Sequence, residues 1–132
     1  MAIPDRLPNG YALQDGATLE ALLATPQWQT NYGITALGTS RASTTPALTL
    51  GSNVVTVATG SNYGVVLPSA VAGSVVYFYN ADAADAVTVF GNASDTINGT
   101  AGATGVSYAA GKRVLFIAVT NNVWIANVMS AT

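Results

Sequence analysis

The chain has few side chains that could act as an acid, a base, a nucleophile or a metal ligand. It contains no histidine and no cysteine. Their absence removes the most frequent general base and metal ligand, and it excludes thiolate zinc sites, disulfides and any Ser-His-Asp triad. Six acidic residues remain: Asp5, Asp15, Glu20, Asp82, Asp85 and Asp95.

Three of these acids fall in polar turn sequences. Asp82 and Asp85 lie in NADAADA, and Asp95 lies in NASDTINGT. A carboxylate pair can do acid–base work, and several carboxylates together can bind Ca²⁺. Turns, however, favour Asp and Asn for their hydrogen bonds to the backbone, and the spacing of these acids matches no calcium loop. We therefore expect structural carboxylates, no catalytic residue, no metal and no cofactor.

Composition limits the remaining function classes. The chain has 132 residues, 50% of them hydrophobic and 8% charged. This length and hydrophobic content predict one domain with its own core. Four Lys and Arg residues make no basic patch, so we expect no nucleic-acid partner. The most apolar stretch, residues 64–79, is interrupted by Pro68 and Gly73, so we expect no membrane span and no membrane partner.

Two parts of the chain differ in pattern. Residues 1–49 predict an irregular N-terminal arm, one short helix over residues 17–25 and a link that includes an edge strand, and residues 50–132 predict a β domain. Leu19, Leu22 and Leu23 have the spacing of one helix face. A helix this short needs a partner, and we favour docking on the chain's own body over docking on another protein.

The β domain is predicted from short segments rich in Val, Tyr, Phe and Ile, separated by Gly and Asn turns about ten residues apart. This pattern indicates an all-β fold, a small antiparallel β-sandwich or barrel-like domain. The sequence shows no repeat of the solenoid type. The expected strands are residues 53–58, 64–67, 74–80, 86–90, 105–109, 113–120 and 122–128.

Two of these segments, residues 75–79 and 114–119, are apolar on both faces. A sheet with one face in water alternates apolar and polar residues, and exposed strands usually contain charges that prevent association. Residues 42–81 and 114–132 contain no charge at all. We therefore expect a homo-oligomer. The residues expected at the subunit interface or in the core are Val75, Tyr77, Tyr79, Leu115, Ile117 and Trp124.

A succession of short motifs between residues 64 and 124 resembles a known domain. The motifs are Leu67-Pro68, Ala70, Gly73, Asn80, Phe90-Gly91, Asp95-Thr96-Ile97-Asn98-Gly99, Ala110-Gly111, Phe116 and Trp124. This succession resembles the small β domain of structural proteins of tailed bacteriophages, found in head decoration (cement) proteins and at the tips of head and tail fibres. The resemblance implies a homotrimer on the virion that is not an enzyme and is made in the bacterial host cytoplasm.

Three functions compete at this point. A decoration protein would bind the outside of the phage head and stabilise the shell, and the short chain favours it because there is no room for a fibre shaft. A fibre or receptor-binding tip would have to present its aromatic strands to a sugar. A polysaccharide depolymerase would need paired carboxylates in a cleft. For a decoration protein, we expect the arm to contact the major capsid protein through Ile3, Arg6, Leu7 and Tyr11.

Overall fold

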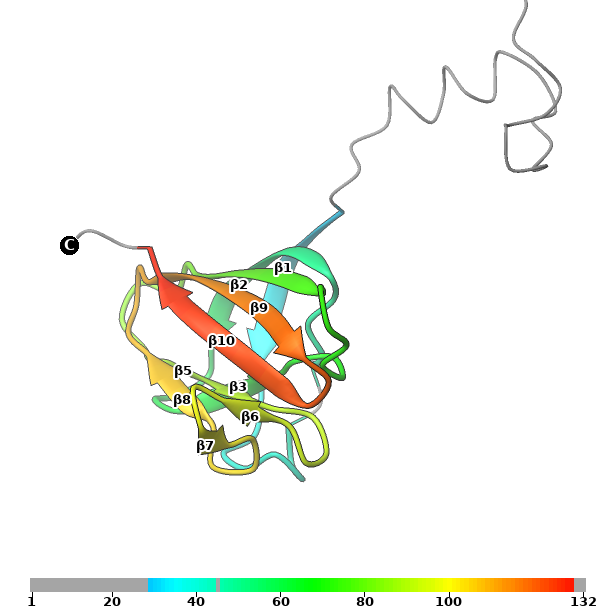
Figure 1. Ribbon diagram of the computed structural model, residues 1–132. Helices are drawn as coiled ribbons and strands as arrows, with labels where there is room; N and C mark the ends of the chain where they lie inside the picture. Colours follow the sequence, from blue (N-terminus) through cyan, green and yellow to red (C-terminus); the bar gives the residue numbers. More distant parts are fainter. Residues whose placement is uncertain (1–28, 45, 130–132) are drawn as a thin grey trace, which may run out of the picture.

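The computed structural model describes residues 29–44 and 46–129, and this part of the chain is all-β (Figure 1). The expected helix over residues 17–25 and the expected arm lie outside the described residues. Ten strands follow one another in the order β1 (Thr30–Ala36), β2 (Gly51–Ala58), β3 (Tyr63–Val66), β4 (Val75–Asn80), β5 (Val87–Phe90), β6 (Thr96–Ile97), β7 (Thr100–Ala101), β8 (Val106–Tyr108), β9 (Arg113–Thr120) and β10 (Val123–Val128).

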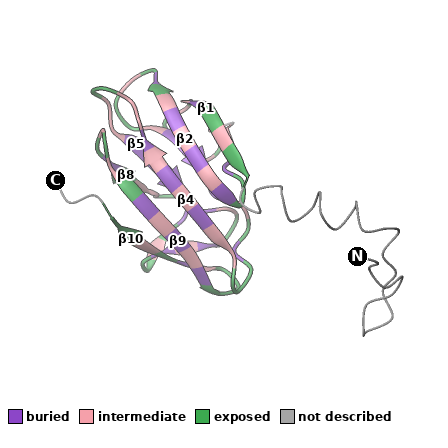
Figure 2. Cartoon of the chain, turned by 90° about the horizontal axis from the view of Figure 1, so that it is seen from above, coloured by how far each residue is buried: buried purple, intermediate pink, exposed green. Residues whose placement is uncertain are grey.

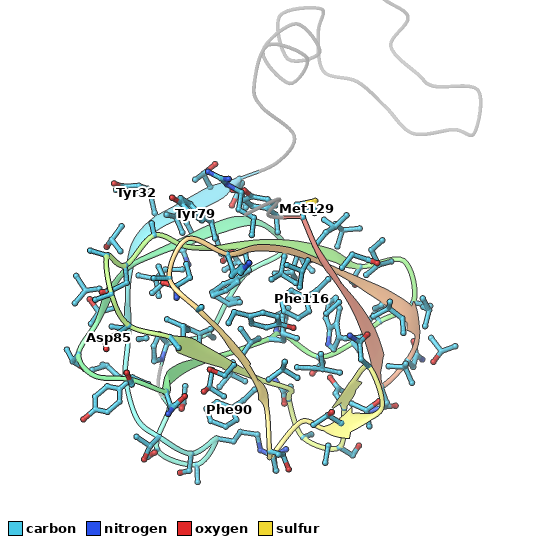
Figure 3. All side chains as sticks on the ribbon, turned by 90° about the vertical axis from the view of Figure 1, so that its left-hand side faces the viewer. Tyr32, Tyr79, Asp85, Phe90, Phe116 and Met129 are labelled. Atoms are coloured by element: carbon cyan, nitrogen blue, oxygen red, sulfur yellow. The ribbon has the colours of Figure 1, made fainter. Side chains whose placement is uncertain are left out.

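The strands form two sheets that enclose one hydrophobic core. The large sheet has seven strands in the order β1-β2-β4-β9-β10-β6-β7, and the small sheet has the order β3-β5-β8. Phe116 lies between the two sheets (Figure 3). Its ring centroid is 6.5 Å from that of Phe78 and 5.9 Å from that of Tyr108, which belongs to the small sheet. This aromatic cluster joins the two sheets at edge-to-face distances.

The first half of the domain is a coil that passes from one sheet to the other. β2 and β4 lie in the large sheet and pair in parallel, while β3 and β5 lie in the small sheet and also pair in parallel. β1 also pairs with β2 in parallel in the large sheet. Between these two strands, Ala47 forms a parallel bridge with Val66 of β3. The arrangement is therefore solenoid-like rather than a clear sandwich, although the sequence has no visible repeat.

The sequence predicted antiparallel strands, and the structure corrects this expectation, because each sheet contains both parallel and antiparallel pairs. Antiparallel pairing is confined to β4–β9, β9–β10, β5–β8 and β6–β7 among the described strands. The sequence Gly60-Ser61-Asn62, which has the composition of a hairpin turn, instead leads β2 into the other sheet as β3. Turn composition marks where a strand ends but does not distinguish a hairpin from a crossover.

The seven strands expected from the sequence are all present within one or two residues, and residues 113–120 match β9 at both ends. β1 and the buried Leu48 lie before position 50 and belong to the same two-sheet body. The two-residue strands β6 and β7 are too short for the alternation of side chains to predict.

Asp95 joins three connecting segments from inside the domain. Its side chain is only 2% exposed. Oδ2 accepts a hydrogen bond of 2.8 Å from the backbone N–H of Ala70, and Oδ1 accepts one of 2.9 Å from Nδ2 of Asn122. Its backbone carbonyl accepts a further bond of 2.8 Å from Gly102. A Cβ on Gly102 would lie 2.7 Å from the Cα of Gly91, so a side chain would break this junction.

We predict that Asp95→Ala lowers the free energy of unfolding by about 1–3 kcal/mol, because the buried N–H of Ala70 loses its acceptor. The measurement is urea denaturation followed by tryptophan fluorescence. Asp85→Ala is the matched control, since Asp85 is half-buried and its carboxylate accepts one exposed bond, from Ser61. Equal effects of the two substitutions would contradict the prediction.

Candidate functional site

The carboxylates of Asp82 and Asp95, two of the three that the structure describes, bind backbone groups of nearby loops. Oδ1 of Asp82 accepts hydrogen bonds from the backbone N–H groups of Ala84 and Asp85, at 2.9 and 2.8 Å, and Oδ2 accepts one of 2.8 Å from Ala58. These N–H groups hold the pKa of Asp82 below its usual value, with Asp85 making the largest contribution. Within residues 29–44 and 46–129, no three acidic side chains gather closely enough to hold a metal ion.

Two asparagines also close the loops of the coil, and the sequence pattern did not predict that they are buried. Asn53 and Asn80 are both fully buried. Nδ2 of Asn53 donates to the carbonyl of Thr49 at 2.8 Å, while Oδ1 accepts from the N–H of Thr49 at 2.9 Å. Nδ2 of Asn80 donates to the carbonyls of Asp85 and Tyr108, at 2.9 and 3.1 Å. These side chains replace backbone partners where the chain leaves a sheet.

The main surface feature is an apolar strip on the side of the large sheet that faces away from the core. We call this strip the outer face. It is made by residues of five adjacent strands, and along β4 and β9 these residues alternate with buried ones (Figure 2). Its members are Tyr32 of β1, Val54 of β2, Val75, Tyr77 and Tyr79 of β4, Leu115 and Ile117 of β9, and Ile125 of β10.

The strand register makes the outer face continuous. Tyr77 pairs with Leu115 at its centre. Ile117 pairs with Val75 on one side and with Ile125 on the other. Side chains directly opposite in adjacent strands lie close enough to contact each other. Ser52 and Asn127 flank this central pair in the neighbouring strands, so the outer face is largely apolar with polar residues beside its centre.

Burial separates the outer face clearly from the core. Val76, Phe78, Val114 and Phe116, the inward neighbours along β4 and β9, are fully buried. Val75, Tyr77, Tyr79, Leu115 and Ile117 are half-buried. Tyr32 is 74% exposed at the margin and lies on the same outer side as Tyr79 (Figure 3).

A single cation accompanies these apolar side chains. Arg113 is the only charged residue in β1, β2, β4, β9 and β10. Its guanidinium carbon lies 4.6 Å from the ring centroid of Tyr79, which is a cation–π distance. The centre of the outer face, around Tyr77 and Leu115, is therefore uncharged.

The structure places five of the expected interface or core residues together: Val75, Tyr77, Tyr79, Leu115 and Ile117 all lie on the outer face. The sixth, Trp124, is fully buried in the core, where its Nε1 has no hydrogen-bond partner among the described residues. The residues expected to contact a capsid lie outside the described residues; they are Ile3, Arg6, Leu7 and Tyr11.

An open hollow of about 600 Å³ adjoins the outer face, and the sequence pattern did not predict it. We call it the margin hollow. Leu50 and Ala72 line it together with Val75, which also belongs to the outer face. Leu50 is 55% exposed, and Val71, which precedes Ala72 in the chain, is 57% exposed. The remaining lining residues are Gln29, Gly51, Gly73 and Ser74.

Comparisons with known proteins give no relative from which a function could be proposed for this chain. No family model, curated protein or solved structure matches the chain. In the part of the chain that the structure describes, no helix is long and apolar enough to span a membrane. The outer face is thus the feature from which a function can be argued.

We predict an acid-sensitive contribution of Asp82 to stability. Because the folded pKa of Asp82 lies below the unfolded value, its stabilising effect is complete above the unfolded pKa, about 3.9, and is lost as the pH falls through the folded pKa. Asp82→Asn should be less stable than the wild type at pH 7, and the difference should shrink below about pH 4. Urea midpoints measured from pH 7 to pH 2 test this, and a difference that stays constant with pH would contradict it.

Proposed function

We propose that this protein is a structural virion protein, a capsid decoration (cement) protein of a tailed bacteriophage that binds the outside of the head as a homotrimer and stabilises the shell. The observation that carries the proposal is the outer face: a largely apolar strip across five strands with an uncharged centre, beside which the polar Ser52 and Asn127 lie. Large exposed apolar patches mark interaction surfaces, and interface cores are rich in aromatic side chains and poor in charges.

A second copy of the chain is the occupant that best fits this surface. Tyr77 lies at the centre of the strip, flanked across the strands by Ser52 and Leu115. Tyrosines at the centre of an interface contribute much of its binding energy. Stable interfaces bury about 800 Å² on each partner, which an area spanning five strands of six to eight residues can supply. The protein then acts by binding and not by catalysis, in keeping with the described carboxylates of Asp82 and Asp95, which are engaged in loop closure.

The arm provides the contact with the shell in this proposal. Residues 1–16 contain the apolar Ile3, Leu7 and Tyr11 together with Arg6. An extended segment of this kind can add a strand to the edge of a capsid sheet, with Arg6 paired to an acidic group. Sixteen extended residues reach at most about 55 Å, enough to connect neighbouring capsid subunits.

The second candidate is a fibre or receptor-binding tip. The observation that favours it is the exposure of Tyr32 at one margin of the outer face, in the same strand row as the Tyr79–Arg113 pair and separated from Tyr79 by Val54. Aromatic rings combined with a cation can bind a sugar, which would use this margin as a ligand surface rather than as part of a subunit contact.

We predict that the wild type sediments at three times its chain mass of 13.3 kDa and that Leu115→Asp dissociates it. The reason is that a charge at the centre of the interface would be desolvated without a partner. Thr104→Asp, in the exposed loop before β8, is the matched control and should remain trimeric. Sedimentation velocity at micromolar concentration gives the result, and near-ultraviolet circular dichroism confirms that each variant is folded. A stable wild-type monomer would refute the proposal.

We predict that the protein binds purified heads of its phage and that deletion of residues 2–14 abolishes this binding without dissociating the trimer. Electron microscopy of heads with and without added protein measures the occupancy. Full occupancy by the shortened protein would show that the arm is not the attachment device. Binding to host cells with no binding to heads would replace decoration by the fibre-tip function.

A further inference from the structure

The turn between β6 and β7 is the dipeptide Asn98-Gly99, to which the proposed function gives no role. The two residues have φ values of 49° and 81° and join two paired strands, as in the two-residue hairpin turn that favours Asn-Gly. Both are exposed to solvent. The backbone N–H of Gly99 donates to no acceptor among the described residues, and a Cβ at this position would meet nothing within 4 Å. The nitrogen of Gly99 is therefore open to reaction.

An open backbone nitrogen directly after an asparagine permits an intramolecular displacement. The deprotonated nitrogen of Gly99 attacks Cγ of Asn98 and forms the bond that closes a succinimide ring, while the side-chain nitrogen takes up a proton and leaves as ammonia. Water then opens the ring at either carbonyl, which gives aspartate or isoaspartate. The net reaction consumes one water and releases one ammonia, with no oxidation or reduction. Glycine has no side chain to obstruct the attack.

The neighbouring residue distinguishes Asn98 from two other asparagines in turns. Asn62 and Asn122 are also exposed and have positive φ, at 69° and 70°. They precede Tyr63 and Val123, whose side chains crowd the attacking nitrogen, and the N–H of Tyr63 also donates a backbone hydrogen bond of 3.2 Å. Within residues 29–44 and 46–129, Asn98 is the one asparagine that glycine follows.

The side chain of Asn98 also joins the hairpin to the large sheet. Its Oδ1 accepts a hydrogen bond of 2.9 Å from the N–H of Ala126, and its Nδ2 donates one of 3.3 Å to the carbonyl of the same residue. The amide thus pairs with β10 as a further backbone residue of β6 would. β6 itself has two residues, which pair with Val123 and Trp124. The two side-chain bonds are therefore a large part of the connection between the hairpin and β10.

We propose that Asn98 is a site of spontaneous deamidation and that its conversion releases the β6–β7 hairpin from β10. The carboxylate that forms has no donor for the carbonyl of Ala126, and isoaspartate adds a methylene to the backbone of a two-residue turn. The hydrogen bonds to Ala126 restrain the amide, so the reaction proceeds through local opening of this edge of the sheet. This inference does not depend on the capsid function, because the reaction occurs within one chain.

Peptide mapping of the folded full chain tests the site. The protein is incubated at pH 8 and 37 °C, and tandem mass spectrometry follows the replacement of NH₂ by OH at each asparagine. We expect Asn98 to convert at least tenfold faster than Asn62 and Asn122, but several-fold more slowly than Asn98 of the same chain unfolded in guanidinium chloride. Asn98→Asp is the matched control, because it cannot deamidate at this position.

Three outcomes would overturn the proposal. Equal rates at Asn98, Asn62 and Asn122 would show that the turn has no special reactivity. An unchanged Asn98 in the folded protein, over the time in which the unfolded chain converts fully, would show that the site is closed. Equal rates for Asn98 in the folded and unfolded chains would show that the bonds to Ala126 do not restrain the amide.

Hydrogen exchange measures the release of the hairpin. The isoaspartate form has an additional negative charge and is separated by anion-exchange chromatography. The N–H of Ala126, which Asn98 accepts in the unconverted protein, should exchange several-fold faster in this form, as resolved by nuclear magnetic resonance. The N–H of Val76, a fully buried residue of β4, is the internal control and should not change. An unchanged rate at Ala126 would also overturn the proposal.

Discussion

The buried carboxylate of Asp95 is the interaction on which the arrangement of the domain depends. It connects the segment between β3 and β4 through Ala70 and the β9–β10 turn through Asn122, while the backbone carbonyl of the same residue accepts from Gly102 after β7. A buried carboxylate is costly unless donors surround it, so its position requires the Ala70 and Asn122 segments to be in place together. The segment that Ala70 begins also provides Ala72 and Gly73 of the margin hollow. One polar contact in the interior thus positions a surface feature.

The unequal size of the two sheets then determines which surface is left open. Three strands of the small sheet face a sheet of seven, and they cover its inner side alone. On the uncovered side, pairs such as Tyr77–Leu115 and Val75–Ile117 stabilise the sheet by about 0.2–1 kcal/mol each. The same side chains leave an apolar surface in water, which association with another chain would remove. Local sheet stability and the tendency to associate therefore have a common origin.

Sequence patterns predict some of these features and not others, for physical reasons. The position of β9 follows from an uninterrupted run of β-forming residues, and the alternation of side chains along β4 and β9 assigns Tyr77 and Leu115 to the face opposite Phe78 and Phe116. The parallel coil was not predictable, because it depends on which sheet a strand joins after a turn. The burial of Asp95 was missed for a related reason: its turn-like surroundings conceal a donor, Ala70, that lies 25 residues away. The margin hollow likewise forms from segments that only the fold brings together.

The motifs that suggested a phage β domain are the residues that the structure uses for folding. Asp95 and Asn80 satisfy loop backbone, Phe116 and Trp124 fill the core, and Gly111 adopts a φ of 80° that favours glycine. None of the motif positions belongs to the outer face or to residues 1–16.

The resemblance therefore bears on the scaffold, whereas a decoration protein and a fibre tip would differ in the surfaces outside the motifs. A fold supports several functions, and the site decides among them. Here the centre of the outer face favours a second copy of the chain, and the tyrosine–arginine margin is the place where a sugar-binding function would have to arise. The choice between the two functions depends on whether Tyr32 and Tyr79 are covered in the assembled protein or remain open to a ligand.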